Sequence, residues 1–220
     1  MTSLIEEQVD IAVVDYGMGN RRSVEKALEH IGAQARVSSD PAELRAADGL
    51  VVPGVGAFPR AMANLRELGL DELLRERVLG ERRPVLGVCL GMQLAFERST
   101  EQGGAAGLGI VPGEVLALES EGLKLPHIGW NEVRFGGGSP LAEGLPDVCA
   151  FYHVHSYAAV PADPHDAIGI CEYGRPFVSA VVRGSFYGVQ FHPEKSSAAG
   201  LRMLANFARI CAGARTPATL

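Results

Sequence analysis

The segment Gly87-Val88-Cys89-Leu90-Gly91 restricts the possible folds of this chain more than any other segment does. An apolar run at 85–88 ends there as a predicted buried strand, and a helical pattern begins at once. A nucleophile on such a tight turn needs glycine two positions before and after it, because β-carbons at those positions would clash. The segment therefore predicts a nucleophile elbow at Cys89, although a buried packing cysteine between two glycines also fits this pattern alone.

The first hundred residues repeat the order of strand and then helix. The periodicity predicts strands at 9–15, 50–53 and 85–88, and helices at 24–31, 62–68, 73–78 and from 90 to about 97. Beyond Ser99 it predicts strands near 113–118, 150–154, 167–171, 178–182 and 186–191, and a closing helix around 201–208. We expect an α/β fold with a mixed, mostly parallel central sheet flanked by helices.

The composition fits one soluble domain over residues 1–220. Hydrophobic residues make up 47% of the chain and charged residues 21%, as in an average globular protein. A formal net charge of −6 argues against binding to duplex nucleic acid, and no apolar run is long enough to span a membrane. The 4 cysteines lack zinc-ligand spacing, which indicates a reducing, cytoplasmic location without a metal or other cofactor.

A second motif supplies the groups that a cysteine nucleophile needs. In Gly188-Val189-Gln190-Phe191-His192-Pro193-Glu194, a predicted strand leads into a loop that carries a histidine and a glutamate. A thiol nucleophile needs a general base, and the base needs a third group that orients its ring. Cys89, His192 and Glu194 can fill these roles, whereas His192 considered alone could equally be a surface-loop histidine.

Two weaker patterns complete the candidate site. Pro53-Gly54-Val55-Gly56 ends another predicted strand, and its N–H groups could donate to an oxyanion, although an ordinary turn between strand and helix fits as well. His153 and His155 have a spacing that could bind zinc. No third ligand lies near them in the sequence, so we do not expect a metal site.

Together these motifs resemble the class I (triad) glutamine amidotransferase family. Further segments are similar to one group within it, the glutaminase subunits of imidazole glycerol phosphate synthases, and the resemblance covers about residues 10 to 209. These segments are Asp15-Tyr16-Gly17-Met18-Gly19-Asn20, Pro53-Gly54-Val55-Gly56-Ala57-Phe58, Pro126-His127-Ile128-Gly129-Trp130-Asn131 and His155-Ser156-Tyr157.

The resemblance implies a reaction with assigned residues. Cys89 would attack the side-chain amide of glutamine and form a glutamyl thioester. His192 would protonate the departing ammonia and then activate water, while Glu194 orients its ring. The implied contacts to glutamine are Gly54, Val55, Gln93, Ser156 and Tyr157, with a peptide N–H near Val55 as the oxyanion donor.

The resemblance also implies a partner, a (β/α)8-barrel cyclase subunit that forms a heterodimer with this chain. The cyclase would use the ammonia to make imidazole glycerol phosphate and an aminoimidazole carboxamide ribotide in histidine biosynthesis. Predicted contacts with the cyclase are Met18, Asn20, Lys195 and Trp130, the last in an expected Gly-Trp-Asn loop. A thiol peptidase with the same triad and a non-catalytic binding module are the two alternatives from other functional classes.

Overall fold

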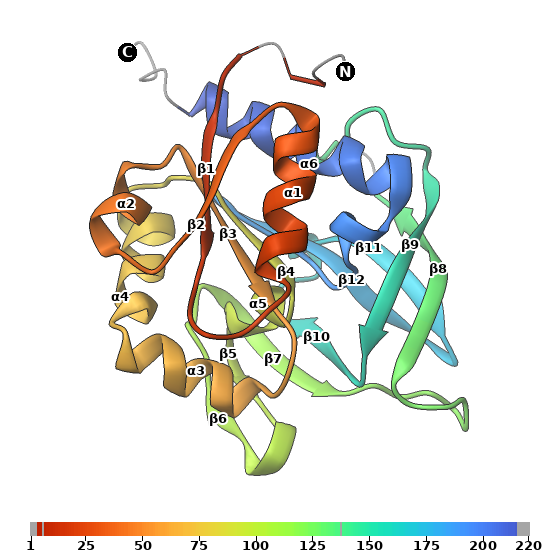
Figure 1. Cartoon of the computed structure of the whole chain (residues 1–220). Helices are drawn as coiled ribbons and strands as arrows, with labels where there is room; N and C mark the ends of the chain where they lie inside the picture. The colour runs from red at the N-terminus through yellow and green to blue at the C-terminus, as the bar shows by residue number, and fades with distance from the viewer. Residues whose placement is uncertain (1–3, 6, 137, 215–220) are drawn as a thin grey trace.

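The computed structural model describes residues 4, 5, 7–136 and 138–214 (Figure 1). The strands are β1 (Asp10–Val14), β2 (Gln34–Ser38), β3 (Gly49–Gly54), β4 (Val85–Cys89), β5 (Phe96–Ser99), β6 (Ala105–Ala106), β7 (Val111–Ala117), β8 (His127–Phe135), β9 (Val148–His155), β10 (Tyr157–Pro161), β11 (Ala167–Tyr173), β12 (Arg175–Arg183) and β13 (Phe186–Val189). The helices are α1 (Arg21–Ile31), α2 (Pro41–Ala46), α3 (Phe58–Glu67), α4 (Leu70–Arg75), α5 (Leu90–Leu94) and α6 (Ser197–Gly213). Shorter helical turns are η1 (Glu76–Gly80), η2 (Glu101–Gly103), η3 (Pro140–Ala142), η4 (Pro164–Asp166) and η5 (Pro193–Lys195).

Five neighbouring strands form the parallel centre of the sheet, in the order β2-β1-β3-β4-β13. Strands β3 and β4 are buried along their whole length. Strands of a parallel sheet are apolar at successive positions because helices cover both faces of the sheet. This centre confirms the expected α/β fold.

The sheet divides at β12, which is antiparallel to β13. One branch continues as β10-β7-β5-β6 and the other as β11-β8-β9, and of these further pairings only β5 with β7 is parallel among the described residues. Strands β2, β5, β6, β8 and β10 were not predicted, and β2 and β8 illustrate the reason. Most of the side chains of β2 are partly exposed, and β8 contains Gly129 and Asn131, so neither strand forms an apolar run.

Helices cover the two faces of the parallel centre separately. Ile11 and Val13 of β1 face the core formed with α1 and α6, whereas Ala12 and Val14 face the core formed with α2, α3, α4 and α5. This alternation follows from the two-residue repeat of a strand. In Figure 1, α1 and α6 lie together on the near side of the sheet.

Two sequence-based expectations were wrong. The helix expected to reach about residue 97 ends at Leu94, and Phe96 begins β5, where its buried side chain and the pairing with Val111 replace the helical turn. Trp130, expected in a loop, lies in the middle of β8 opposite Tyr152 of β9. In both cases pairing with a distant strand outweighs the local pattern, which carried no information about that strand.

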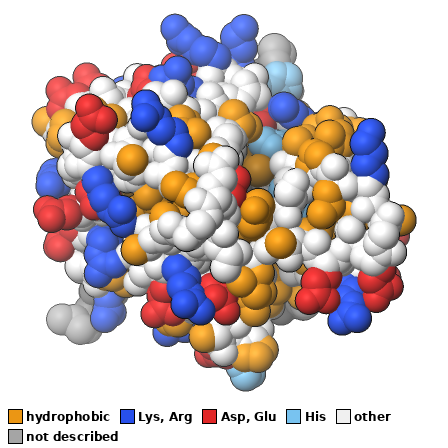
Figure 2. All heavy atoms as spheres, turned by 90° about the horizontal axis from the view of Figure 1, so that it is seen from below, with side chains coloured by type: hydrophobic (Ala, Val, Ile, Leu, Met, Phe, Trp, Pro, Cys, Tyr) orange, Lys and Arg blue, Asp and Glu red, His pale blue; other side chains and the backbone are white. Residues whose placement is uncertain are grey.

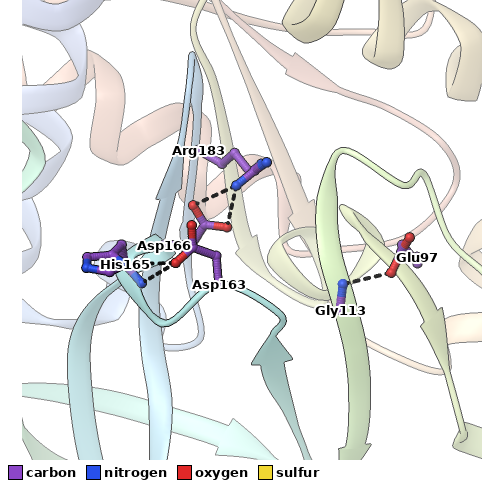
Figure 3. A network of polar contacts seen from close by, with 6 residues as sticks. All are labelled: Glu97, Gly113, Asp163, His165, Asp166 and Arg183. Carbon is purple, nitrogen blue, oxygen red and sulfur yellow. Dashed lines mark hydrogen bonds and ion pairs between the residues drawn. The ribbon is translucent and has the colours of Figure 1, made fainter.

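Polar contacts stabilise the connections around the antiparallel part of the sheet (Figure 3). Arg183, at the end of β12, donates to both carboxylate oxygens of Asp166 in η4, at 3.0 and 3.2 Å. The backbone N–H of Gly113 donates to Glu97 at 2.9 Å and so joins β7 to the neighbouring β5. The first contact holds the η4 turn against β12, and the second links two neighbouring strands.

Within the described ranges, no helix has the length and apolar character that crossing a membrane would require. On the face of the molecule that Figure 2 shows, acidic and basic side chains are interspersed with small groups of hydrophobic ones. This mixture agrees with the modest net charge of −6.

Phe207 of α6 is expected to be a major contributor to stability. It is fully buried, and its ring lies edge-to-face with Tyr187 of β13 at 6.1 Å. Phe207→Ala should lower the free energy of unfolding by about 3–5 kcal/mol, measured by urea denaturation, because it leaves a cavity between α6 and the sheet. Arg202→Ala, at an exposed position of the same helix, should change it by less than about 0.5 kcal/mol. Equal effects of the two substitutions would contradict this role of Phe207.

Candidate active site

The expected elbow is present at the end of β4. Cys89 has φ 55° and ψ −112°, a conformation that L-residues rarely adopt, and α5 begins at the next residue. A β-carbon at Gly87 would lie 2.6 Å from the carbonyl oxygen of Gly91, and one at Gly91 would overlap the carbonyl oxygen of Val52 in β3. Both glycines are therefore required for the chain to turn this sharply.

His192 and Glu194 form a buried pair directly after β13. Nδ1 of His192 donates to Oε1 of Glu194 at 2.9 Å, and the side chains are 3% and 1% exposed. The other ring nitrogen, Nε2, makes no hydrogen bond within the described part of the chain. The glutamate thus orients the ring and leaves Nε2 available for a proton transfer.

The charge state of His192 depends on two opposing effects. Burial lowers the pKa of His192, but interactions with Cys89 and Glu194 raise it more, to about 10. Gln190, two residues before His192, contacts the sulfur of Cys89, so the sulfur lies close to the segment that carries the His192–Glu194 pair. At neutral pH the ring is an imidazolium that can donate a proton.

The sulfur of Cys89 has further polar neighbours. It lies 3.7 Å from the carbonyl oxygen of Val154, and Nε2 of Gln190 donates to it at 3.7 Å. The sequence analysis gave Gln190 no role. One sequence feature could have identified Gln190. It lies two residues before His192, and alternate residues of an extended segment face the same side.

A hollow of about 240 Å³ opens beside Cys89. Of the residues expected to bind glutamine, Val55, Gln93, Ser156 and Tyr157 line it. Gly54, also expected to contact glutamine, does not line the hollow but is paired in register with Cys89. Its missing side chain matters, because a β-carbon there would lie 2.6 Å from that of Leu90.

Glu101 also lines this hollow and was not identified from the sequence. One of its carboxylate oxygens accepts from the backbone N–H of Phe58, at the start of α3, at 2.8 Å. The two residues are distant in the sequence, and no motif surrounds Glu101, so the sequence contained no signal for it.

The turn at Pro53–Gly56 is held from the side of residues 15–20. The hydroxyl of Tyr16 donates to the carbonyl oxygen of Pro53 at 2.7 Å. Met18 lies against the turn, since its terminal methyl is 2.6 Å from the place of a β-carbon at Gly56. Val55 is 44% exposed, so its peptide lies at the open side of the hollow.

The four residues predicted to contact a partner lie in two places. Trp130 is 53% exposed, and its ring meets that of Tyr152 edge-to-face at 6.2 Å. Nζ of Lys195 lies 5.8 Å from the centre of the Tyr152 ring, so Trp130 and Lys195 belong to one surface patch. Met18 lies beside Gly56, as described, and the half-buried Asn20 directly precedes α1.

His153 and His155 lie with His127 in a buried cluster, and His155 also lines the hollow. The ring centres of His127 are 5.0 and 5.1 Å from those of His153 and His155. Nδ1 of His153 donates to the carbonyl oxygen of Phe151, and its Nε2 meets the hydroxyl of Ser179. Among the described residues, no group of three His, Cys, Asp or Glu side chains is arranged to hold a metal ion.

The pKa of His192 should fall when Glu194 loses its charge. In Glu194→Gln, one of the two groups that raise this pKa is removed, so the ring should titrate at a lower pH, as followed by NMR of its carbon-bound protons. Because the wild-type pKa exceeds the ordinary 6.5, the protonated ring stabilises the fold below that pH, and this contribution is lost toward pH 10. Glu67→Gln, exposed on α3, is the control, and an unchanged titration in Glu194→Gln would contradict the assignment.

Comparison with proteins of known sequence agrees with this geometry. The family model described as glutamine amidotransferase class-I matches residues 12–211. Proteins named imidazole glycerol phosphate synthase subunit HisH are 50% identical to the chain in Moorella thermoacetica, over 91% of this chain and 94% of that protein, and in Methylococcus capsulatus, over 90% and 95%.

Solved structures share the fold at low sequence identity. A putative GMP synthase protein from Thermoplasma acidophilum has a TM-score of 0.72 at 22% identity, and covers 96% of this chain and 97% of its own. The structure of PurLQS from Thermotoga maritima has a TM-score of 0.71 at 15% identity, and covers 96% and 100%. With the family model matched over most of its length, the chain belongs to the class-I glutamine amidotransferase family.

Proposed function

We propose that this chain is the glutaminase subunit of an imidazole glycerol phosphate synthase. It hydrolyses glutamine to glutamate and ammonia and passes the ammonia to a synthase partner. The observation that carries this proposal is a buried His192–Glu194 pair beside a cysteine on an elbow, in a chain 50% identical to synthase subunits over nine tenths of its length. The same identity weighs against the peptidase and binding-module alternatives.

The first half of the reaction follows from the charge state of the pair. The proton of the Cys89 thiol resides on Nε2 of His192, so the sulfur attacks the side-chain amide carbon of glutamine as a thiolate and forms a carbon–sulfur bond. The imidazolium of His192 donates its Nε2 proton to the amide nitrogen, and the carbon–nitrogen bond breaks as ammonia leaves. Glu194 keeps the ring in the orientation that presents Nε2 throughout.

The second half reverses the direction of proton transfer. The neutral ring of His192 removes a proton from water, and the resulting hydroxide attacks the thioester carbon. The carbon–sulfur bond breaks, glutamate leaves and the protonated ring faces the sulfur of Cys89 again. Hydrolysis thus needs no group outside the triad for its proton transfers.

The negative oxygen formed in each half needs a hydrogen-bond donor. The turn at Pro53–Gly56 lies beside Cys89, and we assign the donor to a peptide N–H near Val55. Gly56, with φ 113°, permits the backbone rotation that would aim such an N–H at the oxygen. Loss of one such donor costs on the order of 10²–10³ in rate in comparable enzymes.

Three residues around the hollow are assigned to hold the glutamine. Gln93 donates both of its amide protons within the protein, to Tyr157 and Gln190, so its oxygen is the group left to accept from the substrate. Ser156 and Tyr157 contribute the wall formed by the turn between β9 and β10. A hollow of about 240 Å³ suits a single amino acid.

Cys89→Ala should abolish glutamine hydrolysis and leave ammonia-dependent synthesis by the complex unchanged, because the triad serves only to release ammonia. Glutamate formation and synthase product would be measured separately, with glutamine or with an ammonium salt. Cys149→Ala, at a half-buried cysteine in β9, is the matched control and should retain glutamine-dependent activity. Substantial glutamine hydrolysis by the Cys89→Ala complex would exclude Cys89 as the nucleophile.

We further propose that the partner is a (β/α)8-barrel cyclase subunit that docks over the patch of Trp130, Tyr152 and Lys195. Next to this patch Ile128 is 58% exposed, so this side of β8 offers apolar surface. The backbone of Tyr152 accepts from the N–H of His192 at 2.9 Å, which ties the patch to the catalytic loop. Aromatic residues of this kind dominate binding energy at interfaces.

Trp130→Ala should weaken binding of the cyclase by about 2 kcal/mol, roughly thirtyfold in Kd, because it removes the largest exposed side chain of the patch. Titration calorimetry with the cyclase measures the affinity, and the ratio of glutamate to product measures ammonia transfer. Leu79→Ala removes an equally exposed side chain, at 53%, from η1 and should leave both unchanged. Wild-type affinity and a ratio near unity in Trp130→Ala would remove Trp130 from the interface.

A further inference from the structure

Two buried histidines that the proposed reaction does not use connect β8 to the glutamine site. Nδ2 of Asn131 lies 3.3 Å from Nε2 of His127, and Nδ1 of His127 lies 3.0 Å from Nε2 of His155. Nδ1 of His155 lies 2.8 Å from the carbonyl oxygen of Tyr157, which lines the hollow. Four residues from three strands thus form one continuous row of polar contacts.

Hydrogen-bonding chemistry determines the direction of this row. A carbonyl oxygen only accepts, so Nδ1 of His155 carries the proton and its Nε2, in a neutral ring, is an acceptor. His127 must then donate through Nδ1, and its Nε2 accepts from the amide of Asn131. That amide also donates to the carbonyl oxygen of Glu172, at 2.7 Å. Every donor in the row has one acceptor, and each ring has one tautomer.

Burial keeps both rings neutral, as this direction requires. His127 and His155 are 2% and 6% exposed. Burial lowers the pKa of His155 to about 4 and also lowers that of His127. Neither ring therefore gains a second proton at neutral pH.

The carbonyl oxygen of Tyr157 joins this row to the nucleophile. It accepts from Nε2 of Gln93 at 3.0 Å as well as from His155. The same nitrogen of Gln93 donates to Oε1 of Gln190 at 3.0 Å, and Gln190 donates to the sulfur of Cys89. A displaced Tyr157 carbonyl would therefore turn the Gln93 amide away from the position that presents its oxygen to the hollow.

We propose that His127 and His155 are positioning residues for glutamine binding, which hold the Tyr157 carbonyl and through it orient the amide of Gln93. The inference rests on the proposed glutaminase function and adds two residues to its binding site. The effect is on the bound amino acid, because the row ends on a residue that lines the hollow.

His153 shows why packing alone does not explain the row. Its ring stacks on that of His127 at 5.0 Å and is completely buried, yet its hydrogen bonds end at Phe151 and Ser179. It shares the residue type, the burial and the cluster, but it is not part of the row. His153 therefore provides a matched control.

The first test compares substitutions in the complex with the synthase partner. His127→Leu leaves Nε2 of His155 without a donor and should raise KM for glutamine about five- to tenfold while kcat changes less than twofold. His127→Asn keeps a donor at the place of Nδ1 and should stay within about twofold of wild-type KM. His153→Leu should also stay within about twofold of the wild-type KM for glutamine.

The outcomes of this comparison distinguish a failure of the positioning inference from a failure of the proposed function. Wild-type KM in His127→Leu, or equal losses in His127→Leu and His127→Asn, would overturn the inference, as would an equal loss in His153→Leu. Thermal unfolding and ammonia-dependent synthesis verify that each variant is folded. If the wild-type complex does not hydrolyse glutamine at all, the proposed function fails instead.

A double-substitution cycle tests the row even if His127→Leu is unstable by itself. In His155→Asn, the shorter amide can donate to the Tyr157 carbonyl without a partner ring. His127→Leu should therefore cause no further rise in KM in the His155→Asn background. Additive losses would show that the two histidines act separately and would overturn the inference.

The ring tautomers give a readout that does not depend on activity. Nitrogen-15 NMR of the wild-type protein at neutral pH should show His127 and His155 protonated at Nδ1. His155 should lose this signature in part in His127→Leu and keep it in His153→Leu. Protonation of His155 at Nε2 in the wild type would overturn the inference, whatever the glutaminase activity.

Discussion

The sharp turn at Cys89 determines where every other group of the site can lie. Gly91 of α5 packs directly on the backbone of Val52, so helix α5 starts in contact with β3 and leaves no room for a side chain at this position. The backbone of Cys89 adopts a rarely populated conformation as a result, a strain of roughly 1–3 kcal/mol. The surrounding strands β3 and β4 are completely buried, and their packing maintains the turn.

The catalytic chemistry then depends on how the turn's sulfur and Glu194 act on one buried ring. Burial alone would make His192 a neutral base, as it does for the neighbouring His155. The sulfur and the carboxylate reverse this, so two histidines in the same region have opposite charge states at neutral pH. In the proposed reaction the charged ring donates a proton to the departing ammonia, while the neutral ring keeps the single tautomer that the proposed positioning role requires.

Strands β8 and β9 form a two-stranded ribbon with buried side chains on one side and outward-facing aromatic side chains on the other. Side chains alternate along a strand, so His127, His153 and His155 face the interior while Trp130 and Tyr152 face outward. A partner that binds the outward side would therefore lie one backbone layer away from the glutamine site. The hydrogen bond from the N–H of His192 to the carbonyl oxygen of Tyr152 connects the same ribbon to the loop that carries His192 and Glu194.

The sequence by itself determined the elbow, the residues of the proposed triad and every strand of the parallel centre except β2. These features depend on short-range sterics and on local periodicity, and Gly87 and Gly91 are visible in the sequence because no other residue fits. Only the tertiary structure decided the role of His127, the place of Gln190 beside the sulfur, and the strand that replaces the end of the expected helix after Leu94. His127 and His155 are 28 positions apart and Gln93 and Gln190 are 97 apart, so their contacts arise from tertiary packing that no local pattern encodes. A buried histidine becomes a charged acid or a neutral donor according to neighbours that the fold alone brings to it.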